Sequence, residues 1–183
     1  MAVFPVLLDS CVLYPMYLRD TLLRMAEVEL YRVHWSQEIL NAATRNLVEA
    51  GRMTSDRAVR LQKMIENAFP EAMVEVPTEM VEVMKNHPGD RHVLAAAVVS
   101  KASVIVTYNL KHFPSYALDP WGVEAQHPDV FLTHLFDLSP DLVTDVVRQQ
   151  AEDLQRPPLT VETLLDILSK QVPQFANKVK LRI

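Results

Sequence analysis

Asp90-Arg-His-Val-Leu-Ala-Ala-Ala97, followed shortly by Val104-Ile-Val-Thr107-Tyr-Asn109, is the part of this chain whose pattern most clearly predicts regular structure. Its first part predicts a helix that follows a turn at Pro88-Gly89, with Asp90 placed to cap the helix. Its second part is rich in β-branched residues and predicts a strand, with Asn109 just past the end of that strand. The stretch is therefore a helix–strand unit with polar residues at its turns.

The rest of the first 127 residues repeats this alternation. Further strands are predicted at Phe4–Leu8, which ends at Asp9, and at Met73–Val76 and Gly122–Ala125. Helices are predicted at Tyr17–Tyr31, from a Ser36 cap to Gly51, from Thr54 or Ser55 to Pro70, and at Thr78–Met84. Strands that alternate with helices predict a three-layer α/β/α fold, with a central parallel sheet of about four to five short strands.

The character of the chain changes at Pro128. From there no strand is predicted, and three amphipathic stretches are interrupted by Pro157-Pro158. We expect an α/β domain over residues 1–127 and a helical C-terminal extension over residues 128–183. In the tail, residues 178–183 alternate basic and apolar side chains, which leaves an edge strand, a partner-binding segment and a frayed end open.

Composition excludes several classes of protein. Cys11 is the single cysteine of the 183 residues, so an internal disulfide framework is excluded and a reducing, cytoplasmic location is expected. No stretch approaches the roughly 18 uncharged apolar residues of a membrane helix, so no membrane association is expected. A net charge of −5 argues against a protein that binds nucleic acid non-specifically over its whole surface, but it is compatible with binding of RNA at one local site.

Four oxygen-bearing side chains are predicted to meet at one edge of the sheet. Asp9 and Asn109 lie at the carboxyl ends of two strands, where parallel α/β sheets bind ligands. Asp90 begins the helix before the second strand, and Glu38 lies in the first turn of another helix. Carboxylate and amide oxygens are hard ligands, which predicts a Mg²⁺ or Mn²⁺ site.

Three segments together resemble the PIN-domain family. Val6-Leu-Leu-Asp9-Ser10 is similar to the first PIN strand with its metal-binding aspartate, and Asp90–Ala97 is similar to the central PIN helix. The segment Val104–Pro114 resembles the closing motif, in which an acidic or amide residue follows a threonine. The resemblance spans about residues 3–130.

The resemblance implies roles for individual residues. Asp9 and Asp90 would be the principal metal ligands, and Ser10 and Thr107 would support them by hydrogen bonding. Asn109 would complete the catalytic set with Glu38, although the family pattern places the helical acid near Ala42 and often has aspartate in place of Asn109. Three residues are expected to contact RNA or, alternatively, to be ordinary surface residues: Arg45, His92 and Arg19.

The resemblance also implies a function. We expect a metal-dependent endoribonuclease, the toxin of a bacterial type II toxin–antitoxin pair of the VapC-like group, with RNA as substrate, a small antitoxin protein as partner and a homodimeric state. The alternative is a catalytically degenerate PIN-fold module that binds or regulates a protein partner. A haloacid-dehalogenase-type phosphatase is set aside, because Cys11 occupies the position of its second acid.

Overall fold

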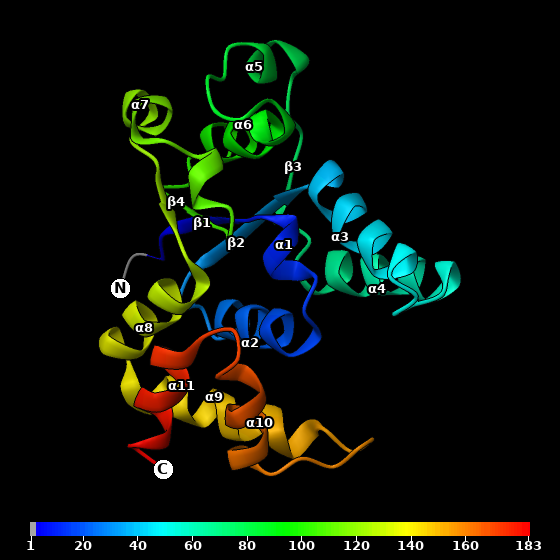
Figure 1. Ribbon diagram of the computed structural model, residues 1–183, viewed down its shortest axis with the longest axis vertical. Coiled ribbons are helices and arrows are strands. Elements are labelled where there is room, and N and C mark those ends of the chain that lie inside the picture. The colour runs from blue at the N-terminus through cyan, green and yellow to red at the C-terminus, as the bar shows by residue number, and fades with distance from the viewer. Residues whose placement is uncertain (1–2) are drawn as a thin grey trace. The chain divides into compact units, whose positions relative to one another are not determined.

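The computed structural model describes residues 3–183, so Met1 and Ala2 of the predicted α/β domain lie outside the described part. The chain forms two compact units (Figure 1). The first runs to Tyr14 and continues from Tyr31 to Gln126, and the second contains Pro15–Leu30 and His127–Ile183. This division differs from the predicted one in residues 15–30, which we had assigned to the α/β domain.

The first unit is built on a five-stranded sheet in which every pairing is parallel. The strands are β1 (Pro5–Leu8), β2 (Arg32–Ser36), β3 (Met73–Val74), β4 (Val104–Val106) and β5 (Glu124–Gln126). Their order is β3-β2-β1-β4-β5. The predicted parallel sheet of four to five short strands is confirmed.

The direction in which strands are added to the sheet reverses between β1 and β4. The chain moves outward from β1 to β2 and β3, then returns to the other side of β1 for β4 and β5. Leu8 pairs with Val106, so Asp9 and Thr107 follow side by side at the carboxyl ends of these strands. Such a switch point is where open α/β sheets bind their ligands.

Helices cover both faces of this sheet. The α-helices of the first unit are α1 (Ser10–Leu13), α3 (Gln37–Glu49), α4 (Ser55–Ala68), α5 (Thr78–Glu82), α6 (Arg91–Val99) and α7 (Ser115–Leu118). Three 3₁₀ turns complete it: η1 (Pro88–Asp90), η2 (Leu110–His112) and η3 (Asp119–Trp121). Because parallel crossovers are right-handed, the reversal of strand order sends α6 and α3 to opposite faces, as Figure 1 shows. The predicted three layers are confirmed.

Local sequence explains the helix boundaries. The Ser36 hydroxyl accepts a hydrogen bond from the Ile39 amide at 3.3 Å, so the predicted Ser36 cap is confirmed. The Thr54 hydroxyl accepts one from the Arg57 amide at 3.4 Å, so of the two predicted starts Thr54 is the cap and Ser55 the first helical residue. In α6, Ala95, Ala96 and Ala97 are fully buried. Small side chains at these positions allow the helix to approach the sheet closely.

The sequence analysis missed strand β2. Its five residues mix exposed polar and buried apolar side chains, and we had assigned no element between Tyr31 and Ser36. Trp35 of β2 is fully buried and meets Phe69 edge-on, with ring centroids 5.8 Å apart. This strand became recognisable only through its pairing with β1 and β3.

The second unit contains helices only, within residues 15–30 and 127–183. Its helices are α2 (Met16–Glu27), α8 (Pro128–Leu138), α9 (Pro140–Asp153), α10 (Val161–Leu168) and α11 (Pro173–Lys180). The predicted helix Tyr17–Tyr31 was too long, because Glu29 adopts a positive φ of 59° that ends the helical path. The edge-strand alternative for the tail is wrong, because Lys178 and Lys180 lie on α11. Among the described residues, none of the helices is long and apolar enough to cross a membrane.

Polar side chains tie the helices of the second unit together. The Thr21 hydroxyl of α2 donates to Gln150 Oε1 of α9 at 2.8 Å. The Asp129 carboxylate, 5% exposed, accepts the backbone amides of Gln174 at 3.1 Å and Phe175 at 2.9 Å. Asp129 therefore fixes the start of α11 against α8.

We expect Asp129→Ala to lower the free energy of unfolding by about 3 kcal/mol, because the buried amide of Phe175 and the partly buried amide of Gln174 lose a charged acceptor. Asp137→Ala is the matched control, since Asp137 pairs with Lys178 on the surface and its loss costs less than about 1 kcal/mol. Urea unfolding followed by circular dichroism measures both. Equal destabilisation by the two substitutions would contradict the role given to Asp129.

Candidate functional site

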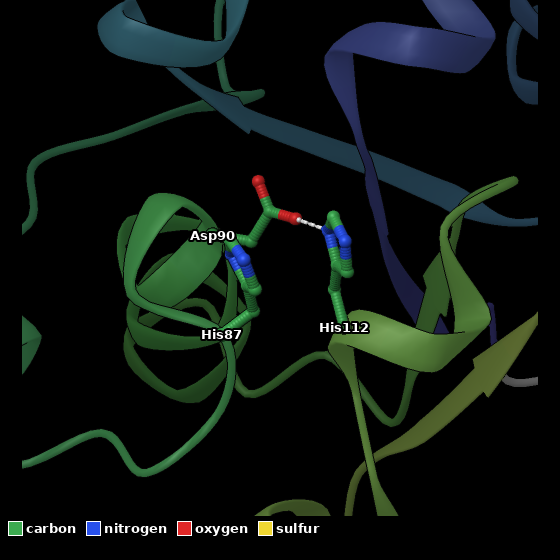
Figure 2. Close-up of side chains that lie close together, drawn as sticks. All are labelled: His87, Asp90 and His112. Carbon is green, nitrogen blue, oxygen red and sulfur yellow. Dashed lines mark hydrogen bonds and ion pairs between the residues drawn. The ribbon is translucent and has the colours of Figure 1, made fainter.

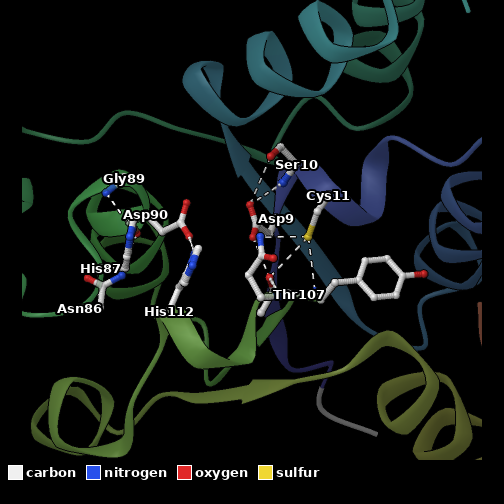
Figure 3. Close-up of polar contacts among 11 residues, drawn as sticks. Asp9, Ser10, Cys11, Asn86, His87, Gly89, Asp90, Thr107 and His112 are labelled. Carbon is white, nitrogen blue, oxygen red and sulfur yellow. Dashed lines mark hydrogen bonds and ion pairs between the residues drawn. The ribbon is translucent and has the colours of Figure 1, made fainter. Parts of the chain in front are cut away.

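Asp9 is the centre of the polar network at the ends of β1 and β4 (Figure 3). Its side chain is 3% exposed and caps α1, with Oδ1 accepting the Ser10 amide at 2.6 Å. Thr107 donates its hydroxyl to Asp9 Oδ2 at 2.7 Å. The backbone amide of Asp9 donates to the Val106 carbonyl at 3.1 Å. The carboxylate is thus held in one orientation by the first residue of α1 and by the residue that follows β4.

Thr107 and Ser10 both contact the Asp9 carboxylate through their side chains. The Thr107 amide donates to the Gln126 carbonyl at 3.0 Å, and its hydroxyl accepts the Asn109 amide at 3.0 Å. The Ser10 hydroxyl lies 3.4 Å from Asp9 Oδ1. Thr107 therefore joins β5, the turn at Asn109 and the Asp9 carboxylate.

Cys11 also belongs to this network, although no sequence pattern marked it as a site residue. Its Sγ lies 3.5 Å from Asp9 Oδ2 and 3.4 Å from the Thr107 hydroxyl, and it accepts the Tyr108 amide at 3.3 Å. Burial, followed by the neighbouring Asp9 charge, raises the pKa of the Cys11 thiol to about 12. The thiol is a hydrogen-bonding neighbour of Asp9 and is not set up as a nucleophile.

The electrostatics of Asp9 suit a cation. Burial raises the pKa of the Asp9 carboxyl, and the nearby Asp90 charge raises it further, against the lowering effect of the hydrogen bonds from Thr107, Ser10 and Cys11. Within residues 3–183, no Lys, Arg or His forms an ion pair with Asp9. Two neighbouring carboxylates, one buried and without a basic partner, form a donor set that fits a divalent cation.

Asp90 starts α6 but does not cap it with its side chain, which corrects the sequence prediction. Its Oδ2 lies 2.6 Å from His112 Nδ1 instead (Figure 2). Asn86 donates its side-chain amide to the Asp90 carbonyl at 2.9 Å. The carboxylate is turned away from the helix end because His112 binds it, and this leaves it beside the Asp9 network (Figure 3).

Among residues 3–183, Glu38 forms no close group of ligand atoms with the two aspartates. It is exposed in the first turn of α3, and its Oε2 is 3.8 Å from His92 Nδ1. His92 Nδ1 is buried and makes no hydrogen bond. Both residues line a cleft of about 610 Å³ at the carboxyl ends of β2 and β3; its other lining residues include Ser36, Val74, Thr78 and Val81. Glu38 thus belongs to a cleft on the same sheet edge as Asp9.

The other three predicted site residues lie in three different parts of the chain. Asn109 follows β4 and is half-buried, with its carbonyl accepting the His112 amide at 2.8 Å. Arg45 is exposed on α3 and lines a separate hollow with residues of α4. Arg19 lies on α2 of the second unit and is buried.

Asp9→Asn is expected to raise the melting temperature of the metal-free protein at pH 8. A carboxyl whose pKa is raised by folding destabilises the folded state once the pH exceeds its unfolded pKa, and an amide carries no such cost. The gain should shrink as the pH falls toward about 4, the ordinary pKa of aspartate. Thermal unfolding in chelator tests this, with exposed Asp119→Asn as control. A lower melting temperature for Asp9→Asn at pH 8 would refute it.

Cys11 is expected to resist alkylation in the folded protein. A thiol with a pKa of about 12 holds about a thousandfold less thiolate at pH 8 than one at the ordinary value of 9.0. Iodoacetamide labelling at pH 8, followed by mass spectrometry, should be at least a hundredfold slower in native protein than in urea. Similar rates in the two states would contradict the packing described for Cys11.

Comparisons with known proteins agree with this architecture. The profile described as "PIN domain" matches residues 5–111, and the profile described as "VapC50 C-terminal domain" matches residues 128–181. "Putative ribonuclease VapC50" of Mycobacterium tuberculosis is 48% identical over 102 residues, which cover 56% of this chain and 60% of that relative. No solved structure matches. Since the PIN profile covers more than half of the chain, the protein belongs to the PIN-domain family.

Proposed function

We propose that this protein is a metal-dependent endoribonuclease that hydrolyses phosphodiester bonds at the carboxyl ends of β1 and β4. The observation that carries the proposal is the buried Asp9 carboxylate, which has a raised pKa, a neighbouring Asp90 charge and no basic partner among residues 3–183. Such an arrangement costs stability unless a cation compensates it. A similar protein bears the name of a ribonuclease, which supports RNA as the substrate.

Asp9 and Asp90 would hold a Mg²⁺ or Mn²⁺ ion, with Asn109 and Glu38 as further oxygen donors. When bound, such an ion lowers the pKa of a water molecule and stabilises the charge that develops on a phosphodiester. The Thr107 hydroxyl and the Ser10 amide each bind one oxygen of Asp9, so this carboxylate needs no reorganisation to receive the ion. His112 performs the same orienting task for Asp90.

The RNA strand would run along the carboxyl edge of the sheet. The cleft of about 610 Å³ beside Glu38 and His92, at the same carboxyl edge of the sheet, offers room for a nucleotide. His92 would face the strand there, and exposed Arg45 would meet the phosphate backbone farther along α3. Arg19 remains a weaker candidate because it is buried. With a net charge of −5, RNA binding depends on such local contacts.

We further infer that the protein acts as the toxin of a type II toxin–antitoxin pair in the cytoplasm, as a homodimer neutralised by a small antitoxin protein. The profiles for the PIN domain and for the VapC50 C-terminal domain match successive parts of the chain, which supports a VapC-type assignment. The matched region covers 60% of the curated relative, so the partner and the substrate of that protein are carried over here as proposals.

A catalytically degenerate binding module is the second candidate. It is favoured by exposed Glu38, which forms no close group of ligand atoms with the aspartates among residues 3–183, and by the neutral side chain of Asn109. Two carboxylates alone would bind a cation more weakly than a set of three or four. Metal-dependent cleavage separates this candidate from the nuclease.

Asp9→Asn and Asp90→Asn are each expected to lower RNA cleavage at least about a hundredfold, because each removes a charged metal ligand. A panel of fluorescent structured RNAs is incubated with the protein in Mn²⁺, in Mg²⁺ and in chelator. Exposed Asp119→Asn is the matched control and should cut as the unaltered protein does. Absence of cutting by a folded protein, with no rise in melting temperature on adding Mn²⁺, would favour the binding module.

Glu38→Gln tests whether this exposed residue takes part. If Glu38 supplies an oxygen donor to the ion, the Mn²⁺ concentration for half-maximal cleavage should rise about tenfold. Glu49→Gln, at the exposed end of the same helix, is the control. An unchanged Mn²⁺ requirement would restrict the metal ligands to Asp9, Asp90 and Asn109.

A further inference from the structure

His87, Asp90 and His112 form a second group of ligand-type side chains (Figure 2). His87 precedes η1, Asp90 ends η1, and His112 ends η2. Each offers one ligand atom, and these atoms all lie within 4.8 Å of one another. Among residues 3–183, no other set of three His, Cys, Asp or Glu side chains meets this condition. The group stands at the edge of the sheet and includes one of the two aspartates described above.

The backbone already holds these three residues together. The His87 amide donates to the His112 carbonyl at 3.1 Å, which ties η1 to η2. The Asp90 amide donates to the His87 carbonyl at 2.9 Å within the 3₁₀ turn. Asn86 donates to the Asp90 carbonyl at 2.9 Å from a buried position. A ligand would therefore meet a framework whose main chain needs no rearrangement.

The side chains need only small rotations to converge on one ion. Asp90 Oδ2 and His112 Nδ1 are 2.6 Å apart, and the two imidazole rings stack with centroids 4.0 Å apart. Donors around a tetrahedral ion at 2.0–2.1 Å lie about 3.4 Å from one another. His87 is exposed, so its ring is able to turn toward Asp90. Coordination through these atoms would give up two hydrogen bonds, the one between Asp90 Oδ2 and His112 Nδ1 and the one from the Gly89 amide to His87 Nδ1.

The donor chemistry selects the class of ion. Two imidazole nitrogens and one carboxylate oxygen suit Zn²⁺ and similar borderline transition metals, whereas Mg²⁺ requires oxygen donors. We infer that His87, Asp90 and His112 form a site for Zn²⁺ or a related transition metal, distinct in chemistry from the oxygen-donor site of Asp9. Three protein ligands leave a fourth position for water.

This site has a consequence for the reaction, which rests on the proposed nuclease function. Asp90 belongs to both donor sets, so a Zn²⁺ ion held by the two histidines withdraws Asp90 from Asp9. Zinc should then inhibit cleavage supported by Mn²⁺ or Mg²⁺, and removal of His87 should relieve the inhibition while Asp9 and Asp90 remain in place.

Isothermal titration of the chelator-treated full chain with Zn²⁺ tests the site directly. We expect one Zn²⁺ per chain in the unaltered protein, and at least tenfold weaker binding in His87→Ala and in His112→Ala. His134→Ala is the matched control, since His134 is exposed on α8 in the second unit, and its affinity should be unchanged. Titration with Co²⁺ adds a visible absorption spectrum, whose intensity should fall in the two cluster variants. Thermal unfolding in chelator checks that each variant is folded.

The rate of RNA cleavage in Mn²⁺ tests the proposed nuclease function separately from the proposed Zn²⁺ site. His87→Ala should cut at the rate of the unaltered protein and resist added Zn²⁺. Zinc binding that depends on His87, in a protein that cuts no RNA, would support the metal site and count against the nuclease. Zinc affinity that stays the same in folded His87→Ala and His112→Ala would overturn the metal site, whatever the outcome of the cleavage assay.

Discussion

The hydrogen bond from the Thr107 hydroxyl to the carboxylate of Asp9 joins the ends of β1 and β4 where the strand order reverses. A buried carboxylate without a basic partner is costly, and the pKa of Asp9 is raised by this burial. The hydroxyl, the Ser10 amide and Cys11 partly offset the cost, and they fix both oxygens of the carboxylate. The fold thus maintains a charge at its switch point that a bound cation would stabilise.

Asp90 lies at the start of α6 but does not cap this helix with its side chain. A residue at this position commonly caps its helix, yet the carboxylate binds His112 and leaves the helix amides without it. The 3₁₀ turn at Pro88–Asp90 sets this direction, and the bond between the His87 amide and the His112 carbonyl holds the turn beside η2. Oxygen donors and imidazoles therefore lie next to one another, and the two metal sites that we propose differ in this ligand chemistry.

Several features were predictable because they depend on local patterns. The buried strand before Asp9, the β-branched strand before Thr107 and the caps at Ser36 and Thr54 follow from residue types over short windows. Strand β2 was missed because its mixture of polar and apolar residues carries no clear period, and its identity comes from its partners. Cys11 was not marked as part of the Asp9 network because a lone cysteine gives no sign of what it will contact.

Residue patterns alone predict the parallel α/β layers, the helical C-terminal part and the positions of Asp9, Thr107 and Asn109 at the ends of strands. These follow from periodicity and from the rule that ligands bind beyond the carboxyl ends of parallel strands. Only the tertiary structure decided that α2 belongs to the second unit, that Glu38 faces a cleft with His92, and that His87 and His112 stack beside Asp90. Those arrangements depend on contacts between residues far apart in the chain, whose directions are set by packing and not by local sequence.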